Sequence, residues 1–173
     1  MAEPVAAKAG VVRRTLTANV PIERAFAVFT QKMGAWWPAT HHIGQQPFTE
    51  IVVEPRTGGR WFERAADGSE CDWGRVAAWE PPNRVTFSWH LQADWRFDPN
   101  PEKASEVEIR FFAEGAGKTR VELEHRALER HGAGWEQIRT GVDSGWGGVL
   151  EEFAKSLMTP EPSSGIPSPR TLT

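Results

Sequence analysis

Residues 135–157 read WEQIRTGVDSGWGGVLEEFAKSL, and apolar side chains recur through them at steps of three and four. That spacing is typical of one stripe along an α-helix, which at about 1.5 Å per residue would extend roughly 35 Å. Glycines interrupt the segment, and each weakens a helix interior by about 1 kcal/mol relative to alanine. We therefore expect packing against an apolar cover to hold this helix. Its stripe is formed by Ile138, Val142, Trp146, Val149, Phe153 and Leu157, and its glycines are Gly141, Gly145, Gly147 and Gly148.

Short segments of alternating apolar and polar residues fill most of the chain before this helix. In the clearest, Val85, Phe87, Trp89 and Leu91 share one face. Such alternation predicts an antiparallel sheet with one buried and one solvated side, and a twisted sheet of this size curls. We expect strands at 11–20, 48–54, 60–65, 70–79, 84–91, 105–114 and 119–126, and two short helices between 21 and 36, the first beginning at Pro21.

This order of elements predicts an α+β helix-grip fold. A curved antiparallel sheet of about six to seven strands would surround the long C-terminal helix, and two short helices would follow the first strand. The domain is expected to span residues 10–158. Residues 1–9 are expected to form a flexible arm, and the Pro/Ser-rich residues 159–173 a disordered tail.

Composition excludes several classes of function. The formal net charge is −3 and no basic stripe is present, so we expect no nucleic-acid partner. No segment approaches the roughly 20 apolar residues of a membrane span, and no signal peptide is evident, so we expect a cytoplasmic protein with no membrane partner. The single cysteine, Cys71, excludes an internal disulfide and a thiolate-cluster metal site.

The aromatic residues suggest an apolar ligand site. The chain has nine tryptophans and no tyrosine. Two interpretations stay open: the rings line a cavity, or they fill a solid core. Likewise Gly141, Gly145 and Gly148 either form the ceiling of a pocket or only let the helix approach the sheet closely. The candidate ligand-binding residues are Trp61, Glu63, Trp73, Phe87, Trp89, Phe111, Leu123, His125, Val142, Trp146 and Val149.

Two of these candidates are polar. The alternation turns His125 inward, where it could bind a ligand carbonyl, act as a general base, or be a core histidine satisfied by its neighbours. Glu63 points inward if it shares a face with Trp61, whereas the opposite register would bury Phe62. An inward carboxylate needs a partner, and we expect His125 or Arg14 to supply it.

Other reactive side chains carry no recognisable motif. Adjacent residues such as His41 and His42 rarely bind one ion together, and no further ligand stands at metal-binding spacing, so a surface loop is expected there. Cys71 has no histidine placed to activate it. Gly58-Gly59 lacks the lysine and the following helix of a phosphate loop. We therefore expect no metal, no cofactor and no assigned catalytic residue.

Several short segments of the chain carry a family resemblance. They are VPIERAF (20–26), WWP (36–38), EPR (54–56), GGRW (58–61), WGRV (73–76), WEPP (79–82), FSW (87–89), VELEH (121–125) and GW (145–146) with Leu150. In this order they resemble the START/SRPBCC (birch-pollen-allergen-like) superfamily, and within it the activator of Hsp-90 ATPase homologue-like family. The resemblance implies a helix-grip fold with a cavity between sheet and long helix that often holds a small apolar molecule. The eukaryotic co-chaperone has a separate N-terminal chaperone-binding domain that is not evident here.

Three functional hypotheses follow. The first is non-enzymatic binding of a small hydrophobic or aromatic molecule between the sheet and the C-terminal helix. The second is a chaperone-associated interaction module, for which the partner would be a chaperone or a second copy of the chain. The third is a cyclase- or hydrolase-type enzyme that uses His125 as its acid/base, although a single polar centre argues against it.

Overall fold

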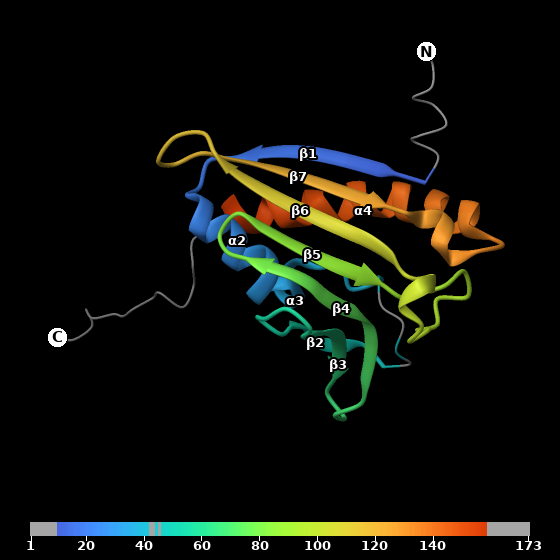
Figure 1. Ribbon diagram of the computed structural model, residues 1–173. Helices are drawn as coiled ribbons and strands as arrows, with labels where there is room; N and C mark the ends of the chain where they lie inside the picture. Colours follow the sequence, from blue (N-terminus) through green and yellow to red (C-terminus); the bar gives the residue numbers. More distant parts are fainter. Residues whose placement is uncertain (1–9, 42–43, 45, 159–173) are drawn as a thin grey trace, which may run out of the picture.

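One antiparallel sheet of seven strands dominates the computed structural model, which describes residues 10–41, 44 and 46–158. The strands lie in the order β1-β7-β6-β5-β4-β3-β2, and the sheet curls around a long helix (Figure 1). The sequence prediction of an α+β helix-grip fold is confirmed. The strands are β1 (Val12–Ala18), β2 (Phe48–Val53), β3 (Arg60–Ala65), β4 (Glu70–Glu80), β5 (Arg84–Trp89), β6 (Ser105–Ala113) and β7 (Thr119–Arg126).

The long helix α4 (Trp135–Met158) lies along the sheet under β1, β7 and β6 (Figure 1). It buries the stripe predicted from its spacing, with Leu150 added. Helices α2 (Ile22–Gln31) and α3 (Met33–Trp36) lie toward its C-terminal half, whereas the connection between β5 and β6 lies toward its N-terminal half. The two ends of the grip are therefore flanked by different parts of the chain.

Three short connections differ in detail from the expectation. Pro21 is the N-cap of α2 rather than its first residue, and its carbonyl accepts a hydrogen bond from the Ala25 N–H at 3.1 Å. Strand β5 ends at Trp89, and Leu91 instead forms an isolated bridge with Phe97. Two 3₁₀ turns complete the fold, η1 (Pro101–Lys103) before β6 and η2 (Leu128–His131) before α4.

The two faces of the sheet have different chemistry, as one-faced alternation predicts. On the inner face the register aligns Ile109 with Leu123, and both are buried against the helices. On the outer face Glu108 accepts hydrogen bonds from Arg84 and Arg126 at 2.7 Å each. Burial alone would raise the pKa of Glu108, but these bonds and Arg110 outweigh it and lower the pKa to about 2. The outer face is thus a network of paired charges.

The expected arm at 1–9 and tail at 159–173 lie outside the described residues. Within the described part of the chain, no helix has the length and apolar character needed to cross a membrane.

Candidate functional site

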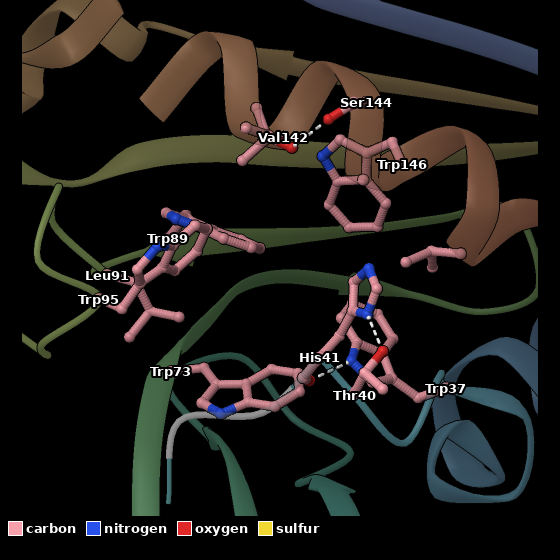
Figure 2. Close-up of a pocket in the computed structure, with 13 residues that line it drawn as sticks. Trp37, Thr40, His41, Trp73, Trp89, Leu91, Trp95, Val142, Ser144 and Trp146 are labelled. Atoms are coloured by element: carbon pink, nitrogen blue, oxygen red, sulfur yellow. Dashed lines mark hydrogen bonds between the residues drawn. The ribbon is translucent and has the colours of Figure 1, made fainter. Parts of the chain in front are cut away.

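A cavity of about 430 Å³ opens between the sheet and the N-terminal half of α4 (Figure 2). The connection between α3 and β2 contributes Trp37, Thr40 and His41 to its wall. Strands β4 and β5 and the loop after β5 contribute Trp73, Trp89, Leu91 and Trp95. Helix α4 contributes Gly141, Val142, Ser144, Gly145, Trp146 and Val149.

Hydrogen bonds of the indole N–H groups fix three of the tryptophan walls. Trp37 donates to the carbonyl of His41 at 2.7 Å, Trp73 to the Glu63 carboxylate at 2.9 Å, and Trp146 to His125 Nδ1 at 3.1 Å. The rings also brace one another, because Trp37 lies 5.1 Å from Trp73 and 5.9 Å from Trp146 between ring centroids. Their apolar surfaces therefore face the cavity in a preformed arrangement.

The mouth of the cavity carries an unusually placed tryptophan. Trp95 is 46 % exposed, and with Met158 it is one of two large exposed hydrophobic side chains in the described ranges. Its backbone has φ of 62°, a left-handed conformation that is uncommon outside glycine. A bond from the Trp95 N–H to the Gln92 carbonyl at 2.7 Å holds this turn. The turn places the ring 6.5 Å from Trp89, at the rim of the cavity.

Two glycines of α4 keep the cavity open because they have no side chain to fill it. A Cβ added at Gly145 would meet no atom within 4 Å, and one at Gly141 would meet only Trp95, at 3.7 Å. These positions match the expected ceiling of a pocket. Gly148 does not line the cavity, although the helix geometry places it within about 60° of Gly145, one turn further along.

Some of the ligand-binding candidates predicted from the sequence line the cavity, and the others lie behind its wall. Trp73, Trp89, Val142, Trp146 and Val149 line the cavity. The others pack behind it: Trp61 stacks on Phe87 with 4.3 Å between ring centroids, and Phe111 lies at the α2 end, against Phe26 and Phe29. Leu123, Glu63 and His125 are buried without lining the cavity. Trp37, Thr40, His41, Leu91, Trp95 and Ser144 line it and were not among the candidates.

His125 belongs to a buried chain of hydrogen bonds. Because the Trp146 indole can only donate, His125 Nδ1 accepts, and its Nε2 carries the proton toward Ser105 Oγ at 2.8 Å. Ser105 then donates to His131 Nε2 at 2.8 Å, and His131 Nδ1 donates to the Gln92 side-chain oxygen at 3.0 Å. Every member of this chain has its partner.

Burial keeps both histidines of this chain neutral. Desolvation, with a smaller contribution from His131, lowers the pKa of His125 to about 3. Desolvation, with a smaller contribution from His90, lowers the pKa of His131 to about 4. His125 has no exposed surface and both its ring nitrogens are engaged. This arrangement favours the core-histidine interpretation over an acid/base role.

Glu63 points inward, and its partners differ from those expected. A register shift in the β3–β4 pairing lies between Trp61 and Phe62, and Phe62, Glu63 and Trp61 are all buried. Phe62 faces outward, with the guanidinium of Arg60 3.9 Å from its ring centroid. The Glu63 carboxylate accepts bonds from Trp73 Nε1 and from the Gly44 N–H at 3.0 Å.

The expected contacts of Glu63 with His125 and with Arg14 are therefore wrong. Arg14 pairs instead with Asp143 of α4 at 2.5 Å, and His125 is satisfied by Ser105 and Trp146. Within the described ranges, the inward carboxylate is bonded by an indole N–H of the adjacent strand and by a backbone N–H of the connection before β2.

His41 is the titratable side chain of the cavity wall. It is exposed at the mouth, and its Nδ1 lies 3.0 Å from the Thr40 hydroxyl. His42, the other half of the histidine pair in the sequence, lies outside the described residues. Within the described ranges, no cluster of three histidine, cysteine or carboxylate side chains could hold a metal ion.

Comparison with known proteins identifies relatives of the whole domain. The family model described as activator of Hsp90 ATPase homolog 1-like protein matches residues 19–158. No curated protein matches the chain in sequence.

Solved structures give more specific likenesses. The chain is 37 % identical to a structure titled as an anthrahydroquino-gama-pyrone synthase, Txn09, complexed with SUM, with a TM-score of 0.62 over 84 % of this chain and 96 % of that one. It is 29 % identical to the self-sacrificing resistance protein CalC from Micromonospora echinospora, with a TM-score of 0.65 over 86 % and 94 % of the two chains. A protein from Arthrobacter aurescens shares the fold alone, at 15 % identity, a TM-score of 0.64 and 89 % of each chain.

Proposed function

This chain belongs to the family of activator of Hsp90 ATPase homolog 1-like proteins, and from that premise we propose that it binds a small, flat aromatic molecule between the sheet and α4. The observation that carries the proposal is the cavity of about 430 Å³, to whose wall five tryptophans contribute. Its volume lies within the range of small-molecule sites, about 300–1,000 Å³.

The shape of the wall favours a planar ligand. The rings of Trp37, Trp73 and Trp146 are fixed by hydrogen bonds of their N–H groups, so they offer ring faces and edges rather than polar groups. An aromatic ligand packed against such rings gains about 0.5–1.5 kcal/mol per ring pair beyond the burial of its area. Because the rings are already in place, little side-chain entropy is lost on binding.

One of the solved relatives supports the same chemistry. Txn09, the 37 % identical relative, is named as a synthase of an anthrahydroquino-gama-pyrone and was determined in a complex. The structural likeness extends over 96 % of the Txn09 chain and 84 % of this one. We carry over from it the class of a fused aromatic ligand.

A surface interaction module is less well supported. Such a module needs an exposed apolar or charged patch. Among the described residues the large exposed hydrophobic side chains are Trp95, which lines the cavity, and Met158 at the end of α4. On the outer face of the sheet Glu108 is paired with three arginines.

Filling the cavity from the helix tests the proposal. Gly145→Leu would project a side chain into space where an added Cβ meets nothing within 4 Å. Titration with anthraquinone-2-sulfonate, followed by quenching of tryptophan fluorescence, should show wild-type binding and a dissociation constant at least tenfold higher for Gly145→Leu.

Gly147→Leu is the matched control. It makes the same change on the same helix, also with no atom within 4 Å of the added Cβ, but about 200° around the helix from Gly145 and outside the cavity lining. Its dissociation constant should stay within twofold of wild type, and thermal melts should show both variants folded. Equal affinity of the two variants, or no binding by the wild type, would overturn the proposal.

A further inference from the structure

Most of the cavity wall is apolar. Among the described residues of the wall, Trp89 has a buried indole Nε1 without a hydrogen-bond partner, and hydroxyl and imidazole groups contribute at the mouth. Ser144 turns its hydroxyl back onto its own helix, toward the carbonyls of Gly141 and Thr140 at 3.3 and 3.4 Å. Thr40 uses its hydroxyl on the ring of His41. Among these mouth groups, the His41 imidazole is therefore the one placed to meet a polar atom of a ligand.

We propose that His41, oriented by Thr40, is a polar anchor at the mouth of the cavity and selects flat aromatic ligands that carry a phenolic hydroxyl or a ring carbonyl. This inference rests on the proposed function and adds to it a residue and a chemical class.

Geometry holds the imidazole at the cavity. The carbonyl of His41 accepts the Trp37 indole N–H at 2.7 Å, and Trp37 is buried among the other tryptophans. This bond fixes the His41 backbone to a rigid part of the wall. One ring nitrogen then lies on the Thr40 hydroxyl, and the other is directed toward the side of the cavity formed by Trp146 (Figure 2).

Because its hydrogen-bond partner is a threonine hydroxyl, the second ring nitrogen of His41 can be either a donor or an acceptor. A threonine hydroxyl can either donate to Nδ1 or accept from it. If Thr40 donates, Nε2 carries the proton and can bind a carbonyl. If Thr40 accepts, Nε2 is an acceptor for a hydroxyl. His125 lacks this freedom because its partner, the Trp146 indole, can only donate.

The surroundings of the mouth would strengthen such a bond once a ligand is present. Leu91 and Trp95 line the cavity together with His41. A planar ligand packed between them would exclude water from the imidazole, and a hydrogen bond in such a site is stronger than one in open water.

Pairs of isosteric probes test the anchor. 2-Naphthol and 2-methylnaphthalene differ by a hydroxyl in place of a methyl group, and 9-fluorenone differs from fluorene by a carbonyl. The quantity to measure is the ratio of dissociation constants within each pair, for the wild type and for His41→Phe. A net hydrogen bond corresponds to a factor of about two to ten, so the preference for the polar probe should fall about fivefold in both pairs.

The apolar probes and a conservative variant serve as controls. His41→Phe should bind 2-methylnaphthalene within twofold of wild type, since an exposed mouth residue is replaced by another ring. His41→Gln, which can still donate and accept, should restore part of the preference. If the ratio of dissociation constants is unchanged in both pairs while 2-methylnaphthalene still binds, the role of His41 is overturned and the proposed function is not. Failure of the wild type to bind any of the four probes would overturn the proposed function itself.

Discussion

The two halves of α4 face the same sheet, but one is packed against its neighbours and the other faces a cavity. Its C-terminal half is packed solid: Phe153 lies edge-on to Phe29 at 5.1 Å between ring centroids, and Trp36 lies at the same distance. Its N-terminal half presents Gly141 and Gly145 to a cavity of about 430 Å³. One regular stripe of side chains thus builds a closed end and an open end.

The difference teaches that the covering segments decide where the space lies. Helices α2 and α3 send Phe29 and Trp36 onto the C-terminal half of α4 and fill it. Over the N-terminal half, the segment at Trp37 and the turn at Trp95 line the edge of the cavity and do not fill it. Where these meet glycine rather than phenylalanine on the helix, the interior stays open.

Truncation at the closed end should produce the largest effect. Phe153 has no exposed surface, and Phe153→Ala removes a ring from a filled core, which costs about 3–5 kcal/mol of unfolding free energy. Urea unfolding measures this directly. A control at the open end is Val149→Ala, which removes less volume next to space that already exists. A loss for Phe153→Ala below about 1 kcal/mol would contradict the view that this end is solid.

Acid should weaken the support of the open end before it affects the paired charges outside. Buried His125 and His131 have pKa values lowered to about 3 and about 4, so the unfolded chain binds more protons than the native one as the pH falls below 6.5. Stability from these groups is complete above pH 6.5 and is lost on acidification. Each contributes up to 1.36 kcal/mol per pH unit, and together we expect a loss of about 4 kcal/mol between pH 6.5 and 4.5.

That pH window separates the histidines from Glu108. The pKa of Glu108 is lowered to about 2, so its contribution is present above its ordinary value of 4.5 and is lost only below it. Urea unfolding at several pH values between 7 and 4.5 tests the prediction, with His131→Gln as the comparison. The glutamine variant should show a shallower pH dependence. A wild-type stability that does not change across this window would show that the buried chain does not set it.

The sequence predicted the elements far better than the walls of the cavity. Periodicity located α4 and the inward faces of the strands, because both depend on side chains a few residues apart. It could not say how deep along the sheet an inward ring lies, so Trp61 and Phe87 were grouped with Trp73 although they pack behind the wall. Whether an inward ring lines the cavity or packs behind its wall depends on where the helices lie over the sheet.

Loop residues were missed for a related reason. Trp37, His41 and Trp95 belong to no periodic pattern, and the fold brings them together from segments about 55 residues apart. The segment WWP at 36–38 carries part of the family resemblance, but nothing local shows that one of its rings faces a cavity. The partner of Glu63 was also unpredictable, because it depends on which strand lies beside β3.

The smallest effect, and the sharpest test of the two sides of α4, concerns its glycines. Gly145 lines the cavity, whereas Gly147 lies about 200° around the helix from it and does not line the cavity. An added Cβ at either would meet no atom within 4 Å. Neither has the positive φ that only glycine tolerates well. Gly145→Ala and Gly147→Ala should therefore each raise the unfolding free energy, by up to about 1 kcal/mol from helix propensity. Urea unfolding should show equal gains, whereas anthraquinone-2-sulfonate affinity should weaken for Gly145→Ala alone. A stability loss at Gly145 would mean that the space above it is filled, and that the open end is as solid as the closed one.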